Sequence, residues 1–136
     1  MGDDSEYFMH AEEDRLKSFK KWPFKTGSCS PSKMAAAGFY HCPTKEAPDA
    51  CKCFVCFKEL EGWEKGDIPW EEHQKHSSSC QYLNLDKPLE KFTIEEFIRF
   101  SIQIQKNRVI KKYAALIKEV EESAAVVEST LESFRS

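Results

Sequence analysis

The chain has 136 residues and a net charge of -3 at pH 7, a size that suits one modest domain with an extension. The acidic balance provides no basic surface for nucleic acid or anionic membranes, and no apolar run approaches the ~20 residues of a membrane span. Residues 1–14 lack the basic start and apolar stretch of a secretory signal. We therefore expect a cytosolic or nuclear protein whose six cysteines are reduced and linked to metal binding, without direct contact to nucleic acid or membrane.

The first half of the chain alternates short periodic segments with turn residues. Residues 1–11 are expected to be flexible. Pro23 and Gly38 end the first two apolar segments, since proline interrupts a helix and glycine favours its C-terminal end. The pattern predicts helices over 12–24 and 32–37, strands at 39–42 and 53–59, and a short helix over 70–76 that begins at Pro69.

Cysteine and histidine residues recur at the spacing of a zinc site. Cys53 and Cys56 form a close pair, sixteen residues separate Cys56 from His73, and six more lead to Cys80. Three thiolates and an imidazole fill a tetrahedral zinc shell and leave no position for water, which favours a structural ion over an enzyme. The alternative, four unrelated polar residues in a core, has less support because a cysteine pair with a downstream histidine and cysteine is uncommon.

The C-terminal third reads as one long helix. Thr93 and Glu96 form a capping box, and neither proline nor glycine occurs from residue 93 to residue 136. Such a helix is about 60 Å long at ~1.5 Å per residue, which exceeds the ~30 Å diameter of the preceding domain. Its apolar residues form two seven-residue rows: Tyr113, Val120, Val127 and Phe134, and Ile110, Ile117, Ala124 and Leu131. We expect helices from partners to cover these rows; the alternative is a helix folded back onto its own domain.

Residues 12–85 resemble the baculoviral IAP repeat (BIR) family. The resemblance is carried by the segments 15–19, 22–23, 34–40, 49–56, 62–63 and 69–80. It implies an α+β fold, in which a short three-stranded sheet and surrounding helices enclose one zinc ion. A linker and dimerisation segment over 86–92 and a long helix over 93–136 would follow this domain.

In members with a single BIR domain, the BIR surface reads the free N-terminus of histone three phosphorylated on threonine. The resemblance assigns three pairs of residues to this surface: Glu61 and Asp67 to the terminal ammonium, Leu60 and Trp63 to the first alanine side chain, and Lys58 and His76 to the phosphate. A solvated surface is the alternative for Lys58 and His76. Ala47 departs from the family pattern, which often has an acidic residue at this position.

The same resemblance implies an adaptor of the chromosomal passenger complex. The rows at Ile110, Tyr113, Ile117, Val120, Val127 and Leu131 would form a helix bundle with borealin and the inner centromere protein. The complex places Aurora B kinase at centromeres and kinetochores and later at the spindle midzone and midbody, so we expect the chain in nucleus and cytoplasm. Tyr7, Leu89 and Phe97 match a homodimer surface, and Ser30 matches a phosphosite. The alternative function is an inhibitor of apoptosis that binds caspases or pro-apoptotic proteins beginning with alanine.

Overall fold

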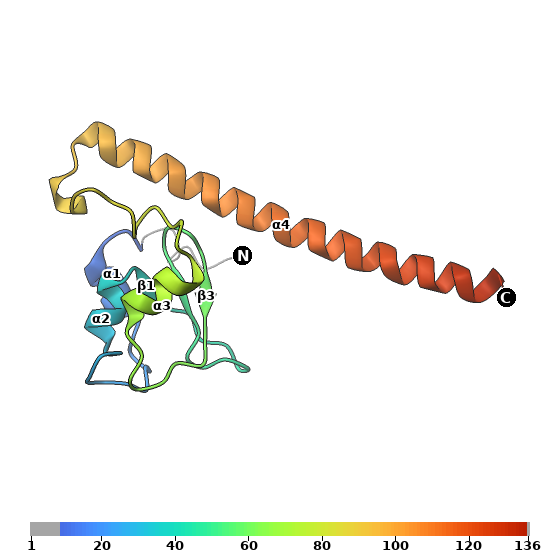
Figure 1. Cartoon of the computed structure of the whole chain (residues 1–136), viewed down its shortest axis with the longest axis horizontal. Helices are drawn as coiled ribbons and strands as arrows, with labels where there is room; N and C mark the ends of the chain where they lie inside the picture. Colours follow the sequence, from blue (N-terminus) through green and yellow to red (C-terminus); the bar gives the residue numbers. More distant parts are fainter. Residues whose placement is uncertain (1–8, 136) are drawn as a thin grey trace.

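The computed structural model describes residues 9–135, in which short helices surround a three-stranded antiparallel sheet and one long helix leaves this domain (Figure 1). The elements are α1 (Glu12–Lys17), α2 (Pro31–Ala36), β1 (Phe39–His41), β2 (Cys51–Cys53), β3 (Glu59–Leu60), α3 (Pro69–His76), the 3-10 helix η2 (Leu89–Lys91) and α4 (Ile94–Arg135). The α+β class predicted from the sequence is confirmed.

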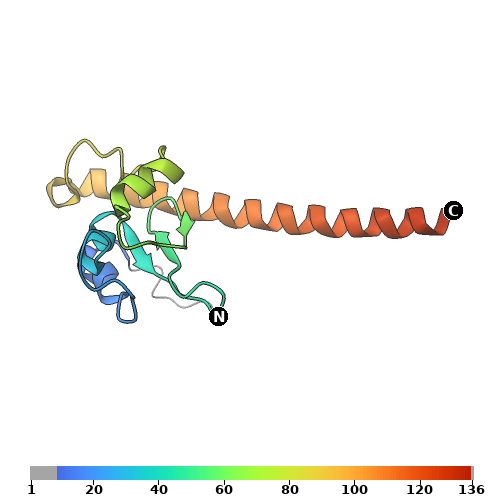
Figure 2. The same cartoon turned by 60° about the horizontal axis from the view of Figure 1, so that its bottom comes forward.

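The sheet is small and its strands follow chain order, β1-β2-β3. Phe39 lies opposite Cys53 in the first pair of strands, and Cys51 lies opposite Leu60 in the second. Helices α1 and α2 contact each other and β1 (Figure 2). Gly38 joins α2 to β1 with a φ of +97°, and a Cβ there would lie 2.9 Å from the Tyr82 ring. Both the backbone angle and the close packing therefore require glycine.

The first helix is shorter than predicted. It ends at the sixth residue, so the prediction of a helix over 12–24 was wrong in its second half. The Ser18 hydroxyl donates to the Arg15 carbonyl oxygen at 2.6 Å and accepts from the His41 N–H at 2.8 Å. These bonds attach the end of α1 to β1, and the following chain buries the Trp22 side chain in the core. Tertiary contacts therefore override the local helical pattern.

The predicted strand over 53–59 was also wrong. The backbone turns after Cys53, and Phe57 has a φ of +61°, in the left-handed region. The Phe57 N–H donates to the Cys53 carbonyl at 3.0 Å, and the Cys53 N–H donates to the Lys58 carbonyl at 3.1 Å. A tight turn therefore separates β2 from β3, and the sequence pattern merged the two strands into one.

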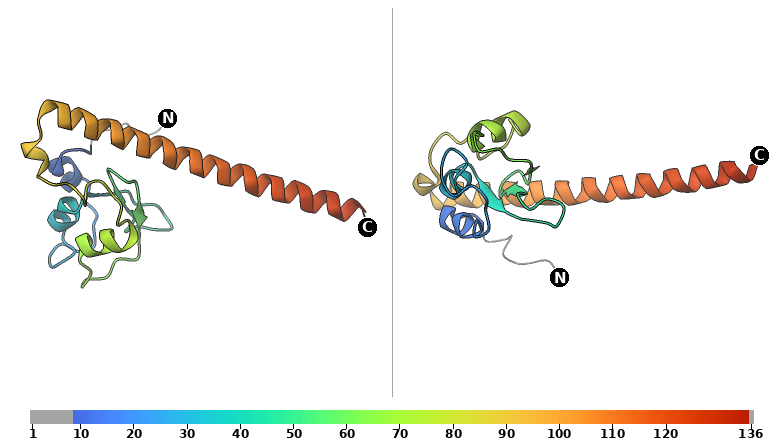
Figure 3. Two further views of the ribbon diagram at one scale, coloured as in Figure 1. Left: turned by 45° about the horizontal axis from the view of Figure 1, so that its top comes forward. Right: turned by 90° about the horizontal axis from the view of Figure 1, so that it is seen from below.

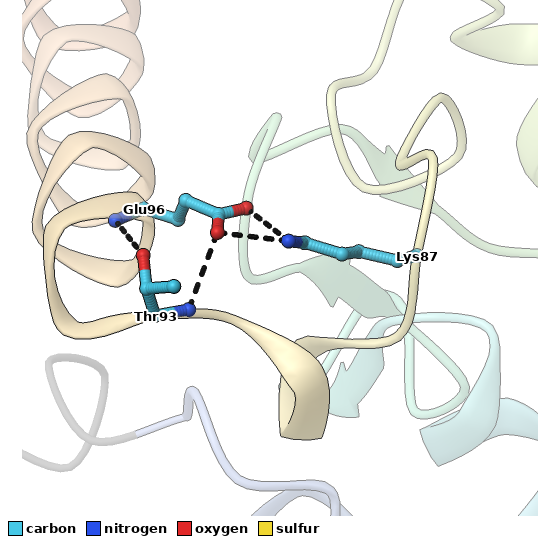
Figure 4. Close-up of polar contacts among 3 residues, drawn as sticks. All are labelled: Lys87, Thr93 and Glu96. Carbon is cyan, nitrogen blue, oxygen red and sulfur yellow. Dashed lines mark hydrogen bonds and ion pairs between the residues drawn. The ribbon is translucent and has the colours of Figure 1, made fainter.

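The other helix starts lie close to their predicted positions. Helix α2 begins at Pro31, one residue before the predicted start, and α3 begins at Pro69. The capping box of α4 is present: the Thr93 Oγ1 accepts from the Glu96 N–H at 3.2 Å, and the Glu96 Oε1 accepts from the Thr93 N–H at 3.4 Å (Figure 4). Lys87 also contacts the Glu96 carboxylate, at 2.6 Å. This network fixes where the long helix begins.

A buried arginine lies among the aromatic and aliphatic core residues. Arg15 is 1% exposed, and its Nε donates to the Ala35 carbonyl at 2.9 Å. Its guanidinium lies 4.2 Å from the Phe54 ring centroid and donates to the carbonyls of Met9 and His10. Because three carbonyl oxygens accept from it, the buried charge is tolerated and holds the segment before α1 against the core.

Helix α4 packs on the domain only at its beginning. Phe100 and Ile104 are buried, and the Arg108 guanidinium lies 5.0 Å from the Phe57 ring centroid. From Val109 to Arg135 every residue is exposed, and the helix projects well past the domain (Figures 1 and 3). Among residues 9–135, no helix combines the length and apolar character needed to cross a bilayer. Folding back onto the domain is therefore limited to the first turns.

Candidate metal centre and binding surfaces

Strand β2, helix α3 and the turn that follows each of them bring the predicted metal ligands together. Cys53 ends β2, Cys56 lies in the turn before β3, His73 projects from α3, and Cys80 follows α3. Their donor atoms all lie within 4.8 Å of one another. Residues separated by as many as 27 positions therefore meet at one point, as the spacing of the sequence predicts.

The distances fit a tetrahedral zinc ion. The Cys53 and Cys80 Sγ atoms are 3.8 Å apart, and the Cys56 Sγ lies 3.6 Å from the His73 Nε2. Zinc–sulfur bonds of ~2.3 Å in a tetrahedron place neighbouring ligand atoms roughly 3.8 Å apart. The His73 Nδ1 lies 2.8 Å from the Ala37 carbonyl, so this nitrogen carries the proton and leaves Nε2 to bind metal. The cluster is a structural zinc site with zinc as the cofactor.

The protonation of the four ligand side chains also fits the binding of a divalent cation. Burial and hydrogen bonds with the neighbouring thiols raise the pKa of Cys53, whereas hydrogen bonds from Cys53 and Cys80 lower the pKa of Cys56. Burial would lower the pKa of His73, but hydrogen bonds to Cys56 and Cys80 raise it to about 9. The cluster thus retains protons that a metal displaces, and zinc binding releases them.

Further donors support the metal ligands. The Ser77 hydroxyl donates to the Cys56 Sγ at 3.3 Å, and the Val55 N–H donates to the Cys53 Sγ at 3.3 Å. In the folded domain these bonds orient the two sulfur ligands. Since four protein atoms complete the zinc shell, the ion joins β2, the turn and α3 and has no open position for a substrate.

The other three cysteines are not part of this centre. Cys29, Cys42 and Cys51 form no disulfide. Burial raises the pKa of Cys29 to about 11 and raises the pKa of Cys51 further still. Fully buried thiols with raised pKa values are unreactive, so Cys29 and Cys51 serve as packing residues.

The structure brings together part of the predicted peptide surface. The Trp63 Nε1 donates to the Leu60 carbonyl at 3.3 Å, and the Trp63 ring packs edge-on against Phe39 with 5.6 Å between ring centroids. The Asp67 carboxylate accepts from the Glu64 N–H at 2.8 Å, which closes the loop after β3. Leu60, Trp63 and Asp67 therefore belong to one short ordered segment.

The remaining peptide-surface residues lie on separate elements. Lys58 is half-buried before β3, and Glu61 is exposed after it. His76 lies at the end of α3, where its Nε2 is 3.5 Å from a Glu72 carboxylate oxygen on the same helix. The Glu72 carboxylate is therefore a neighbour of the His76 imidazole on the same helix.

Two polar residues that the sequence reasoning missed support these sites. The Asp49 carboxylate accepts from the Trp63 N–H at 2.7 Å and thereby positions the loop after β3. The Asn107 Nδ2 donates to the Val55 carbonyl and to the Gln81 Oε1, each at 2.9 Å. A lone asparagine in a charged helix gives no signal of this role, which depends on how α4 docks against the zinc-binding turn.

The predicted dimer and assembly residues differ in burial. Tyr7 lies outside the described residues. Leu89 is half-buried against the core, and the Phe97 ring is 44% exposed with its centroid 6.2 Å from that of His10. Ser30 precedes α2 with its hydroxyl 3.4 Å from that of Ser32. The predicted bundle positions are between 41% and 65% exposed: Ile110, Tyr113, Ile117, Val120, Val127 and Leu131.

Comparison with known proteins agrees with this architecture. A family model described as BIR, Inhibitor of Apoptosis domain, matches residues 15–84. Baculoviral IAP repeat-containing protein 5 of Cavia porcellus is 48% identical over 127 residues, which cover 93% of this chain and 89% of the relative. The rat (Rattus norvegicus) protein of the same name is 46% identical over the same shares of both chains. Baculoviral IAP repeat-containing protein 5.2-A of Xenopus laevis is 41% identical, with 95% of this chain and 83% of the relative covered.

Proposed function

Because this chain belongs to the BIR family, a non-enzymatic family, and is a homologue of survivin, we propose that it is an adaptor that couples a protein-terminus reader to an assembly helix. One observation carries the proposal: a closed zinc module continues into a helix whose apolar residues are exposed from Val109 onwards. A closed zinc shell leaves the module to bind and not to catalyse, and exposed apolar rows of this length require partners.

The zinc module reads the N-terminus of histone three that carries a phosphothreonine. Leu60 and Trp63 hold the first alanine, and Glu61 and Asp67 bind the terminal ammonium. Lys58 and His76 meet the phosphate, which carries a charge of about -1.5 to -2 at neutral pH. Glu61 and Asp67 follow β3, Lys58 precedes it and His76 ends α3. The proposed surface therefore offers both charges to a peptide end that itself carries both.

The exposed rows of α4 bundle with helices of borealin and the inner centromere protein. In this way the chain places Aurora B kinase at centromeres and kinetochores in early mitosis and at the spindle midzone and midbody later, so it works in nucleus and cytoplasm. The half-exposed Phe97 and half-buried Leu89 offer a second surface for a homodimer. Ser30, before α2, is the phosphorylated residue.

A second candidate is an inhibitor of apoptosis, because the matching family model carries that description. The same pocket at Leu60 and Trp63 would take the first alanine of pro-apoptotic proteins, or the chain would bind caspases. This role needs neither the phosphate contacts nor the exposed rows of α4.

Calorimetry with three peptides tests the proposal and separates the two candidates. The peptides are the histone-three tail with and without phosphothreonine, and a pro-apoptotic peptide that begins with alanine. We expect the phosphopeptide to bind about a hundredfold more tightly than the unmodified tail, since each of the two cationic contacts contributes about 1.4 kcal/mol. An acetylated N-terminus should abolish binding. Tighter binding of the pro-apoptotic peptide than of either tail would favour the second candidate.

A further inference from the structure

A cleft of about 700 Å³ lies between the zinc domain and the linker that leads to α4, drawn in yellow in Figure 1. Four parts of the chain line it: residues around the start of α1, Trp70 at the start of α3, Tyr82 and Leu83, and the linker residues 85–90. None of the residues assigned to the histone tail lines this linker cleft, so it is separate from the proposed histone surface.

Two aromatic side chains lie together in the linker cleft. The ring centroids of Trp70 and Tyr82 are 6.2 Å apart, with 59° between the ring planes. The Tyr82 hydroxyl donates to the Ala36 carbonyl at 2.8 Å, which fixes the orientation of that ring. Trp70 is 40% exposed. A partly exposed indole beside a fixed phenol ring offers π surface to a cation, because the faces of aromatic rings carry negative charge.

Three carboxylates share the lining with these rings: Glu12, Asp86 and Glu90. All three residues are exposed, and none of them forms a salt bridge or a side-chain hydrogen bond with another residue in the range 9–135. Burial raises the pKa of Tyr82, Arg15 lowers it, and Glu12 and Glu90 raise it again. Two of the three carboxylates therefore lie within electrostatic reach of the Tyr82 ring.

The two cationic residues of the lining already have acceptors. Arg15 is buried and donates to three backbone carbonyl oxygens, and the Lys87 Nζ lies 2.6 Å from a Glu96 carboxylate oxygen. Burial lowers the pKa of His10, and Arg108 and Arg15 lower it further, so this imidazole is neutral at pH 7. The linker cleft therefore keeps an excess of negative charge.

We propose that the linker cleft binds an arginine side chain within a short basic segment of a partner protein. A guanidinium is planar and always charged, so it stacks on an exposed indole and donates to carboxylates at the same time. Leu83, Leu85 and Pro88 offer apolar contacts to the neighbours of the arginine. Charge complementarity favours this occupant over an acidic or purely apolar segment.

This binding goes beyond the adaptor role and does not depend on it. Leu89, which lines the cleft, is shared with the proposed homodimer surface, and every variant used below leaves it unchanged.

Nitrogen–proton correlation NMR of the full zinc-loaded chain tests the proposal. The probe is the peptide Gly-Leu-Arg-Leu-Gly, acetylated and amidated at its ends, so that it lacks the terminal ammonium that the proposed histone surface requires. We expect the indole signal of Trp70 to shift, whereas those of Trp22 and Trp63, which are 1% and 7% exposed, should stay in place. Citrulline in place of arginine keeps the shape but not the charge and should raise the dissociation constant about tenfold.

Two variants test the aromatic and the acidic residues separately. Trp70→Ala should raise the dissociation constant about tenfold, as followed by the Tyr82 signals. The combined change of Glu12→Gln, Asp86→Asn and Glu90→Gln should also raise it about tenfold, and it affects only exposed side chains, so the fold is retained.

The matched control changes Glu46, Glu64 and Glu121 to Gln. It removes the same charge from exposed positions outside the cleft and should leave the dissociation constant unchanged. A Trp70 signal that does not shift at millimolar peptide overturns the proposal. Equal binding of the citrulline peptide would also overturn it and would make the cleft an apolar groove without charge selection. Equal binding of a lysine peptide would overturn the choice of arginine, because a planar cation would then have no advantage.

Discussion

Single buried polar groups decide how precisely the binding surfaces are held. Asp49 contributes one carboxylate oxygen to the Trp63 N–H at 2.7 Å, and Trp63 in turn donates to the Leu60 carbonyl. The pocket proposed for the first alanine is therefore fixed by a residue outside it. Because Trp63 is only 7% exposed, water has little access to replace a lost bond.

Asp49→Ala should destabilise the domain by about 1–3 kcal/mol, because it leaves the buried Trp63 N–H without an acceptor. Urea unfolding followed by tryptophan fluorescence measures this change. Asp49→Asn retains an amide oxygen as acceptor and serves as the matched control, with a smaller loss expected. Unfolding midpoints that agree for Asp49→Ala and the unmodified chain would show that the bond contributes nothing.

Lys58→Ala and His76→Ala should each weaken binding of the phosphorylated histone tail more than binding of the unmodified tail. The loss should be about tenfold for the phosphopeptide, since each variant removes one cationic contact to phosphate. Calorimetry with both peptides measures the difference. Lys75→Ala, a neighbouring exposed lysine on α3, is the control. Equal losses for the two peptides would exclude these residues from phosphate binding.

At the scale of elements, the sequence predicted best where one local rule decides the outcome. The capping box and the absence of proline and glycine gave the start and type of α4, and the ligand spacing gave the zinc cluster. The extent of α1 and the division of 53–59 into a turn and two strand ends could not be predicted. Both depend on long-range contacts, namely Ser18 with His41 and the positive φ of Phe57.

Removal of zinc should unfold the domain, because its ligands join β2, the following turn and α3 and the domain has little other secondary structure there. Zinc binding contributes on the order of 10 kcal/mol to small zinc domains, which exceeds what a core of this size supplies. Cys56→Ser should behave like the chelated protein, whereas Cys42→Ser, which alters a cysteine outside the cluster, should retain one zinc per chain.

Near-ultraviolet circular dichroism and metal analysis measure both effects. Part of the far-ultraviolet helical signal should persist without zinc. The backbone hydrogen bonds of α4 beyond Arg108 are formed within the helix and do not involve the zinc domain. A chelated chain that keeps its near-ultraviolet spectrum would contradict a structural role for the metal.

At the scale of the whole molecule, α4 belongs to two units at once. Its first turns bury Phe100 and Ile104 against the zinc domain, and Asn107 donates to the Val55 carbonyl within the zinc-binding turn. Its remaining turns are exposed. The resemblance to the BIR family predicts a domain that ends at residue 85, before the linker. The packing of Phe100 and Ile104 indicates that the stable unit extends to about Arg108.

Truncation separates these two roles of α4. A chain that ends at Arg108 should unfold at the same urea concentration as the full chain and should lose binding to partner helices. A chain that ends at Asn84 should be less stable by about 3–6 kcal/mol, because two buried side chains of ~1.5–3 kcal/mol each are removed.

Ile104→Ala in the full chain isolates the contribution of one of these buried side chains and should lower the free energy of unfolding by about 2–5 kcal/mol. Ile102→Ala is the matched control, since Ile102 is 51% exposed on the same helix. Equal free energies of unfolding for the chains that end at 84 and at 108 would show that the contact of α4 with the domain contributes no stability. The folded unit would then end before the linker.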